Sequence, residues 1–429
     1  MALMPNAWKR VSRTGVHAAA RLPSHPDIME KHRVAIIGGS FGGLTVAHTL
    51  RRLLPRAQQE ITLISREDKF VFIPSLPWVA MGEKSLAQIS IPIRQSLESR
   101  GVRYLQGTVE HIDLASQRLH TGDGECEYDF LVIATGHRSA NEAVSGLGPF
   151  DGPGHSLMSA DEAQEAADAW QAFLSDPGPM VIGCAPGASC IGPAYEFAFE
   201  VDHALRRRKL RHKVPIQFVT PEPFLGHFGV GGVDRARRFF EDELDRREIG
   251  YHTSVAVSKI STDSVQLAGG EEFESRYSLV LPPLAGVGVV QDTEGLTNPK
   301  GFIPTDASFR HPDFKNVYAA GVAVALPPIG DSAVPVNFPK TGQMTVQMAR
   351  AVAHNIAADI KGGSRREKPL SVQCILDLGD RAAKLLADPV RPPRNRTKVS
   401  IGKRWLWAKQ AYEPWFLLRT RLGRPPGPW

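Results

Sequence analysis

Cysteine is scarce in this sequence, and long apolar runs are absent from it. Only four of the 429 residues are cysteines, too few for a disulfide scaffold in a chain of this length, so each thiol is interpreted from its neighbours. No apolar run approaches the roughly eighteen to twenty residues of a membrane-spanning helix, and we expect no transmembrane segment. The first 32 residues lack the continuous apolar core of a signal peptide. We interpret residues 1–32 as a disordered N-terminal extension.

The body of the chain lacks a net positive charge, and the excess of basic residues is concentrated at the two ends. The net charge is +6, yet the segment from Arg391 to Trp429 alone holds ten basic residues against one acidic residue, Glu413. A nucleic-acid-binding protein with the same net charge would carry it on a recognition surface instead. The composition therefore argues against a nucleic-acid partner and draws attention to the C-terminal segment.

Segments with the character of strands and helices alternate along the chain. A strand, a glycine loop, a helix and a second strand follow one another from Arg33 to Ser65, and a similar unit begins at Pro179. The apolar strand candidate YDFLVIATG lies between them at Tyr128–Gly136. This alternation predicts βαβ units and an α/β fold with mostly parallel sheets. We expect two Rossmann-like dinucleotide-binding domains, formed by residues 33–150 with 300–362 and by residues 151–299, followed by a C-terminal region at 363–429.

The first glycine loop has the spacing of a dinucleotide-binding fingerprint. Gly38, Ser40 and Gly43 occupy its three positions, and Gly42 adds room. The first position permits a tight turn, and the second lets the backbone approach a pyrophosphate. The third lets the helix pack on the strand, so that the helix N-terminus faces the phosphates. A strand before the loop and a helix after it make this a dinucleotide site.

The end of the second strand departs from the usual pattern. An acidic residue commonly binds the ribose hydroxyls at this point, whereas the chain has Ser65 and Arg66 there. A serine hydroxyl can hydrogen-bond a ribose. Ser65 and Arg66 are therefore the candidates for contacting the adenosine part of the cofactor.

The second loop has lost two of the three glycines of the fingerprint. Gly183 opens it, but Ala185 and Ala188 take the next two positions, and a β-carbon at the second position obstructs a pyrophosphate. We expect this unit to keep its fold and not to bind a nicotinamide dinucleotide. Cys190 follows at the mouth of the predicted helix, where the helix dipole would lower the pKa of its thiol. Cys190 is the first candidate for a redox-active residue.

Six segments distributed along the chain match the motifs of one known family. They are FIPSLPWVA (Phe72–Ala80), GASCIGPAYEF (Gly187–Phe197), FLGHFG (Phe224–Gly229), NVYAAGVAVALPP (Asn316–Pro328), PKTGQM (Pro339–Met344) and VQCILDLGDRAA (Val372–Ala383). In these segments the chain resembles the sulfide:quinone oxidoreductases, and the resemblance covers the chain from about Arg33 to Trp415. The resemblance implies an FAD-dependent enzyme that oxidises sulfide and reduces a membrane quinone.

The resemblance implies roles for four side chains near the sulfide site. Cys190 and Cys374 match two thiols that hold a growing sulfur chain, and Glu196 and His227 match a nearby carboxylate and histidine. The residues alone leave other interpretations open. Most buried cysteines are inert core thiols, a lone histidine is more often structural, and Glu196 could be a solvent-facing acid on a helix.

The resemblance also implies which residues form the flavin site. Lys340 matches a lysine near the pyrimidine end of the flavin, where a positive charge would stabilise the anionic reduced form. Gly321 falls in a loop that contacts the flavin. The other residues expected to bind FAD are Phe41, Pro74, Ala134, Thr135, Gly136, Val322 and Thr341.

Four positions depart from the family pattern or have no counterpart in it. Some members carry a third cysteine that can bind flavin covalently, and Met158 stands at that position, so we expect non-covalent FAD. Glu162 replaces a histidine for which an acid–base role has been considered. Cys126 is interpreted as a thiol in a surface turn and Cys184 as a structural residue, and no metal site is expected.

The tail from Pro369 onward is interpreted as short helices separated by prolines. A helix from about Ser400 would be interrupted at Pro414, and basic residues such as Lys409 would flank its apolar stripe. Short, basic and aromatic amphipathic helices suit the membrane interface, although such a helix could instead pack on the protein or in a dimer contact. The apolar residues of the two successive stripes would be Ile401, Trp405, Ala408 and Tyr412, then Trp415, Leu418 and Leu422.

A quinone reductase must lie against the bilayer, so the tail and the resemblance agree on a peripheral position on the cytoplasmic membrane. A homo-oligomer would strengthen such attachment. Three other functions fit parts of the sequence: the flavoprotein subunit of a sulfide dehydrogenase, a type II NADH:quinone oxidoreductase, and a non-catalytic flavin-binding protein. The basic aromatic tail argues against the first, and Ala185 argues against the second.

Overall fold

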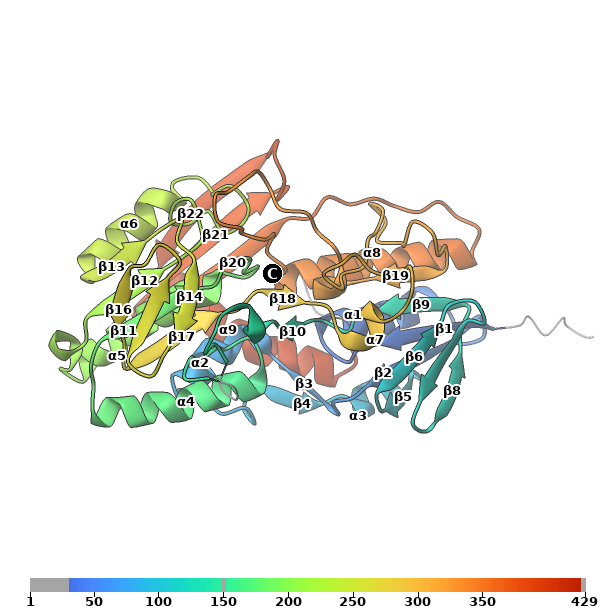
Figure 1. The fold of residues 1–429 in the computed structure, drawn as a ribbon. Helices are drawn as coiled ribbons and strands as arrows, with labels where there is room; N and C mark the ends of the chain where they lie inside the picture. Colours follow the sequence, from blue (N-terminus) through green and yellow to red (C-terminus); the bar gives the residue numbers. More distant parts are fainter. Residues whose placement is uncertain (1–30, 149–151, 426–429) are drawn as a thin grey trace, which may run out of the picture. The chain divides into compact units, whose positions relative to one another are not determined.

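The first glycine loop joins β1 (His32–Ile37) to α1 (Phe41–Leu53) at the centre of a parallel sheet (Figure 1). The computed structural model describes residues 31–148 and 152–425, so most of the expected N-terminal extension, and Trp429, lie outside the described residues. The strand order is β19-β9-β1-β2-β5, and the inner strands are apolar runs buried on both faces. The other strands of this sheet are β2 (Gln59–Ser65), β5 (Arg103–Gln106), β9 (Phe130–Ile133) and β19 (Val317–Ala319).

A segment distant in sequence completes this first sheet. β19 pairs with β9 in parallel, and α8 (Gly342–Ile360), which follows it, packs against α1. A β-carbon on Gly43 would overlap the carbonyl oxygen of Gly38. The third fingerprint position therefore requires glycine for α1 to lie this close to the loop, as the sequence predicted.

A second parallel sheet repeats the arrangement. Its order is β13-β12-β11-β17, and β11 (Met180–Cys184), which is buried throughout, leads through the second loop into α5 (Gly192–Arg207). α4 (Ala160–Ser175) begins with a capping box between Ser159 and Glu162, so Glu162 stabilises a helix end here. The other elements of this region are β12 (Ile216–Val219), α6 (Ala236–Arg246), β13 (Ile249–His252) and β17 (Tyr277–Leu281). The α/β fold with two Rossmann-like sheets is confirmed.

Short elements connect and cover the two sheets. The antiparallel sheets β6-β7-β8 and β14-β15-β16, and the pairs β3-β4 and β10-β18, lie outside the parallel sheets. Their bounds, with the intervening helices, are β3 (Lys69–Val71), η1 (Ile73–Ser75), α2 (Leu76–Ala80), β4 (Ser90–Pro92), α3 (Arg94–Glu98), β6 (Val109–Asp113), β7 (Arg118–Thr121), β8 (Gly124–Glu127), β10 (Arg138–Ser139), η2 (Asn141–Ala143), η3 (Arg211–Lys213), β14 (Val257–Ile260), β15 (Ser264–Leu267), β16 (Glu272–Glu274), β18 (Leu284–Ala285), α7 (Gly288–Gln291) and η4 (Gly321–Ala323).

The C-terminal region is not the series of short helices expected from the sequence. It forms an antiparallel sheet of β20 (Val372–Asp377), β21 (Ala382–Asp388) and β22 (Arg396–Gly402), followed by α9 (Lys403–Arg421). Pro389, Pro392 and Pro393 fall in the connection between β21 and β22. Buried positions alternate along most of β21, as expected for a sheet with one buried face, and runs this short are not distinguishable from a helical pattern by periodicity.

α9 continues through Pro414 instead of ending there. A proline inside a helix lacks the N–H that would bond the carbonyl one turn earlier. Pro414 lies on the exposed side of α9, where water can satisfy that carbonyl. Pro414 therefore does not separate the two predicted stripes, but Ile401 of the first stripe lies in β22 and Leu422 of the second is the C-cap residue after α9. No helix among residues 31–148 and 152–425 combines the length and apolarity needed to cross a membrane.

Candidate active site

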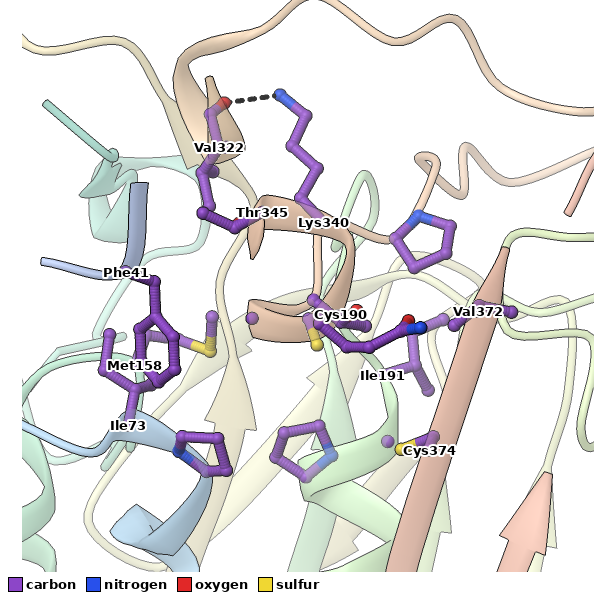
Figure 2. Close-up of a pocket in the computed structure, with 18 of the residues that line it drawn as sticks. Phe41, Ile73, Met158, Cys190, Ile191, Val322, Lys340, Thr345, Val372 and Cys374 are labelled. Carbon is purple, nitrogen blue, oxygen red and sulfur yellow. Dashed lines mark hydrogen bonds between the residues drawn. The ribbon is translucent and has the colours of Figure 1, made fainter. Parts of the chain in front are cut away.

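One cavity lies where the first glycine loop, the N-terminus of α5 and β20 meet (Figure 2). Its empty space, counted to the open mouth, is about 1820 Å³, and its wall is mostly apolar. In the view of Figure 2, Phe41 and Met158 stand on one side and Cys190 and Cys374 on the other. The residues predicted from the sequence that line this cavity are Ser40, Phe41, Gly42, Pro74, Ala134, Gly136, Cys190, Glu196, Gly321, Val322, Lys340, Thr341 and Cys374.

The glycine loop offers backbone N–H groups without a local partner. Ser40 caps α1 in an extended conformation but its side chain makes no capping hydrogen bond, and no acidic residue stands in the first turn. Gly38 has a φ of 110°, and a β-carbon there would overlap the carbonyl oxygen of Ala134. A helix N-terminus with free amides and no side chains in front of it is suited to phosphate. This donor set fits the pyrophosphate of a flavin dinucleotide.

The other residues predicted to bind the cofactor do not line the cavity. Ser65 is buried at the end of β2, and its Oγ lies 2.7 Å from the position that a β-carbon of Gly39 would take. The guanidinium of Arg66 pairs with Glu67 at 2.8 Å on the surface. Of the rest of this group, Gly38 and Thr135 stand in the turns after β1 and β9, and Gly43 stands in the first turn of α1.

Lys340 is a buried cation on the cavity wall. Its Nζ donates to the carbonyl oxygen of Val322 at 2.9 Å (Figure 2) and lies 3.3 Å from the ring centroid of Phe302. Burial, with the nearby charge of Lys300, lowers the pKa of Lys340 to about 7. His137 lines the same wall and was not predicted, and burial with the charge of Lys340 lowers its pKa to about 4. At neutral pH His137 is therefore uncharged, and a negative group bound in this space would favour the charged form of Lys340.

The two predicted redox thiols reach the cavity from different elements. Cys190 stands in the loop before α5 and Cys374 on β20, and a β-carbon on Gly192 would stand 4.0 Å from the Sγ of Cys374. Both thiols are free. Burial raises the pKa of Cys190 to about 11 and that of Cys374 to about 12, and the charge of Cys190 adds to the rise at Cys374. The thiol of Cys190 is thus close enough to influence the ionisation of Cys374.

The lowered pKa expected for Cys190 is wrong. α5 begins at Gly192, two residues beyond the cysteine, and the thiol faces an apolar wall. Desolvation disfavours a thiolate more strongly here than the end of a helix favours it. The thiols of the protein without bound groups are therefore protonated at neutral pH.

The remaining cysteines are buried. Cys126 is 9% exposed and packs into the core from β8, so its interpretation as a surface-turn thiol is wrong. Its side chain points inward because β8 alternates between exposed and buried positions. Cys184 is fully buried at the end of β11, and burial, with the charges of Glu222 and Cys190, raises its pKa.

A buried ion pair joins α5 to α9 at the cavity wall. The ammonium of Lys409 lies against the carboxylate of Glu196, and both residues line the cavity. Lys409 is 7% exposed and Glu196 is 4% exposed, so the expectation that Lys409 flanks an exposed stripe is wrong. Burial lowers the pKa of Lys409 to about 7, with Glu413 opposing the shift. The Trp78 ring lies 4.7 Å from this ammonium.

His227 is not brought to the cavity. Its Nδ1 accepts a hydrogen bond from the N–H of Gly229 at 3.2 Å, and its ring lies edge-on to Phe224. Burial, with the charge of Arg394, lowers its pKa. The neighbouring Phe228 lines the cavity instead. The geometry gives His227 a place in the turn that positions Phe228.

The second glycine loop is covered by another part of the chain. Gly187 donates its N–H to the carbonyl of Pro335, and its own carbonyl accepts from Nδ2 of Asn337. The N–H of Asn337 also bonds the carbonyl of Ala188. The backbone groups that a dinucleotide would use at this loop are therefore engaged by the protein, and Ala185 is fully buried.

The model of the pyridine nucleotide-disulphide oxidoreductases matches residues 32–353, and the chain belongs to this class of enzymes, which implies a flavin cofactor. Within it, the sulfide-quinone reductase of Aquifex aeolicus (strain VF5) is 39% identical over 403 residues, which cover 92% of this chain and 92% of that protein. The chain accordingly belongs to the sulfide-quinone reductase family.

Solved structures and more distant relatives agree with this placement. The crystal structure of the sulfide:quinone oxidoreductase from Aquifex aeolicus matches with a TM-score of 0.88 and 38% identity, over 92% of this chain and 93% of that one. The type II NADH:quinone oxidoreductase of Staphylococcus aureus (strain NCTC 8325 / PS 47) is 22% identical over 79% of this chain and 85% of that protein. At 22% identity, the likeness to the type II NADH:quinone oxidoreductase concerns the fold alone.

Proposed function

We propose that this protein is a sulfide:quinone oxidoreductase, which takes two electrons from sulfide at Cys190 and Cys374 and delivers them through FAD to a membrane quinone. The observation that carries the proposal is that both thiols line the cavity that the first glycine loop also enters. The identity and coverage of the sulfide-quinone reductase relative support it.

The proposal divides the chain by role. Residues 33–150 and 300–362 would bind FAD, because β1, β2, β9, β19 and the glycine loop belong to one sheet. Residues 151–299 would form a Rossmann-like domain without a nicotinamide dinucleotide, because its loop is hydrogen-bonded to Pro335 and Asn337. Residues 363–429 would serve the quinone and the membrane. The adenosine contacts of Ser65 and Arg66 remain part of this proposal.

The sulfide half-reaction would use the two thiols in turn. In the oxidised state a disulfide or sulfur bridge joins Cys190 to Cys374, and hydrosulfide attacks one of its sulfurs. The bridge bond breaks, a persulfide forms on one cysteine, and the other leaves as a thiolate. Loss of the persulfide proton and of two electrons then closes a bridge that is one sulfur longer. When bound, FAD supplies the two-electron acceptor for this step.

Lys340 would stabilise the negative charge that reduction places in the cavity. Its ammonium is buried and held at Val322 by a hydrogen bond, so it needs no reorganisation to face a developing anion. The pKa of about 7 leaves it poised between its two forms in the absence of an anion. A bound anion would raise that pKa and keep the side chain charged.

The Glu196–Lys409 pair would supply protons to the quinone, a role that differs from the place near the sulfide site that the resemblance implies for Glu196. Reduction of a quinone to a quinol takes up two protons, and this pair is an acid–base couple buried in the cavity wall. Lys409 belongs to α9, the helix that also carries exposed apolar side chains. Its pKa of about 7 is near the pH at which a proton donor works best.

α9 would hold the protein against the membrane. Trp407, Trp415, Leu418 and Leu422 project from one side of it with exposed fractions of 65%, 39%, 55% and 47%, and Ile73 adds an exposed apolar side chain. Large exposed apolar residues in a helix with basic neighbours are typical of the membrane interface. Trp415, Leu418 and Leu422 form the second predicted stripe. The first predicted stripe is not exposed in the same way, because Trp405 and Tyr412 are half-buried against the protein.

FAD would be bound without a covalent link. Met158 lines the cavity near Phe41 (Figure 2), and a thioether offers no thiolate to attach to a flavin. Precipitation of the purified protein with acid should therefore release all of its flavin into the supernatant. Flavin that stays with the precipitated polypeptide would contradict this part of the proposal.

The test of the thiols is an anaerobic titration with sulfide. Cys190→Ser and Cys374→Ser should each retain FAD, as judged by the flavin absorbance, but should fail to bleach with sulfide while still bleaching with dithionite. Cys126→Ser is the matched control, because this thiol lies in the core away from the cavity, and it should bleach like the wild type. Normal bleaching of Cys190→Ser by sulfide would remove the proposed role of the cysteines.

A further inference from the structure

A second large cavity lies between the C-terminal ends of α1 and α9. Its empty space is about 1250 Å³, and it shares no lining residue with the active-site cavity. Among the described residues, no aspartate or glutamate lines it. Six arginines do: Arg51, Arg52, Arg56, Arg100, Arg419 and Arg424.

The arginines of this basic cavity have no carboxylate partner among the described residues. The hydrogen bonds of Arg51, Arg100 and Arg419 go to main-chain carbonyl oxygens, at 2.9, 2.7 and 3.0 Å. Elsewhere in the protein, arginines that converge do so around an acid: Arg206, Arg211 and Arg247 all pair with the buried carboxylate of Asp202. The basic cavity has the arginines of such a cluster and lacks the anion.

The floor of the basic cavity contains polar atoms that are buried and unpartnered. His48 is 2% exposed and lines the cavity, and neither of its ring nitrogens has a hydrogen-bond partner. Nε and Nη1 of Arg51 are buried and unpartnered as well. Buried polar groups in native proteins nearly always have a partner. The cavity thus presents donors that lack an acceptor.

Helix capping explains only part of this cluster. Arg51 and Arg52 stand in the last turn of α1, where cations suit the helix dipole. Arg56, Arg100 and Arg424 come from the segments that follow α1, α3 and α9, so three separate parts of the chain place positive charge at one point. The dipole of α1 does not provide a hydrogen-bond partner for the buried ring nitrogens of His48 either.

We propose that the basic cavity binds the phosphate group of an anionic phospholipid. Guanidinium groups match the oxygens of a phosphate in charge and geometry, and several of them can bind one phosphate together. A bound phosphate would supply the anion that this cluster of arginines lacks.

The apolar surface beside the cavity indicates a lipid as the source of the phosphate. Leu418 and Leu422 flank Arg419 on α9, one turn apart, and are 55% and 47% exposed. Acyl chains could lie along these side chains while the headgroup occupies the cavity. The inference rests on the membrane attachment of the proposed function and adds to it a site for one class of lipid.

Vesicle binding by the full-length flavoprotein tests the site. Vesicles of phosphatidylcholine alone are compared with vesicles that contain phosphatidylglycerol, by flotation, for the wild type and for Arg51→Gln/Arg100→Gln. The matched control is Arg404→Gln/Arg421→Gln, which removes the same charge from exposed positions of α9 that do not line the cavity. The wild type should prefer the phosphatidylglycerol vesicles by about tenfold or more, since each basic residue near an anionic surface adds several-fold in affinity. The cavity variant should lose most of this preference, and the control should keep most of it.

Equal losses in the two double variants would show unspecific attraction to the anionic surface and overturn the proposal. Thermal unfolding with inorganic phosphate provides the second readout: phosphate should raise the melting temperature of the wild type and not that of the cavity variant. If phosphate stabilised the wild type but the protein bound both vesicle types equally, the cavity would be a site for free phosphate. That result would overturn the proposal that a phospholipid binds there.

Activity with a soluble short-chain quinone separates this inference from the proposed function. Both double variants should keep the wild-type rate, because neither changes a residue of the active-site cavity. Loss of sulfide-dependent quinone reduction in the wild type would refute the proposed function, and the vesicle preference would then still decide the lipid site.

Discussion

Replacing Lys409 with methionine should strongly destabilise the protein. The substitution removes the ammonium that lies against Glu196 and leaves a carboxylate that is 4% exposed without its counter-charge. Breaking a buried ion pair by removing one partner costs about 3–5 kcal/mol. That is a large part of the 5–15 kcal/mol by which a typical protein is stable. The expected effect is therefore a fall of about 3–5 kcal/mol in the free energy of unfolding.

The double variant Lys409→Met/Glu196→Gln should recover most of this loss, because both charges are then absent and only neutral groups remain buried. Lys403→Met is the matched control on the same helix, and since Lys403 is exposed it should change stability by less than about 0.5 kcal/mol. Urea unfolding followed by tryptophan fluorescence measures all three. In anaerobic stopped-flow experiments, Lys409→Met should reduce its flavin with sulfide normally but return the electrons to quinone more slowly.

Two outcomes would refute the reasoning. If Lys409→Met were no less stable than Lys403→Met, the ammonium would not be compensating a buried charge. If the double variant were as unstable as Lys409→Met, the loss would come from packing against Trp78 and its neighbours and not from the unpaired carboxylate.

Two further predictions concern the thiols and the glycine loop. Burial raises the pKa of Cys190 to about 11 and that of Cys374 to about 12. Alkylation of these thiols by iodoacetamide in the reduced protein, followed by peptide mass mapping, should therefore accelerate about tenfold per pH unit from pH 7 to 10. A rate that reaches a plateau below pH 8 would contradict these pKa values. Gly38→Ala should abolish FAD retention, because its β-carbon would overlap the Ala134 carbonyl. Gly124→Ala is the control, because Gly124 has a φ of 127° and open space around it. This control should lose only about 1–2 kcal/mol of stability to backbone strain and should keep the flavin.

The parts of the fold that follow from local sequence were predictable. The first loop combines a strand, three small residues at fixed spacing and a helix within one short segment, and the structure forms these elements as expected. The cavity also gathers Cys190, Cys374 and Lys340 from three segments far apart in the chain. Their motifs, and not their spacing, allowed the sequence to group them.

The features that depend on distant contacts were not predictable in the same way. The strands β20 to β22 stabilise one another by antiparallel pairing, and nothing within a single short apolar run distinguishes such a strand from a helix. The position of Lys409 depends on how α9 packs against α5, so a helical pattern alone placed it beside the exposed stripe. The pKa of Cys190 likewise depends on the apolar wall that other segments build around it.

The most direct test of the central claim is a sequential anaerobic titration of the wild-type protein. Sulfide is added first, then a short-chain quinone, while the flavin absorbance is recorded, and a parallel sample receives NADH in place of sulfide. Sulfide should bleach the flavin, quinone should restore it, and NADH should leave it oxidised. Reduction by NADH together with no reduction by sulfide would contradict the account.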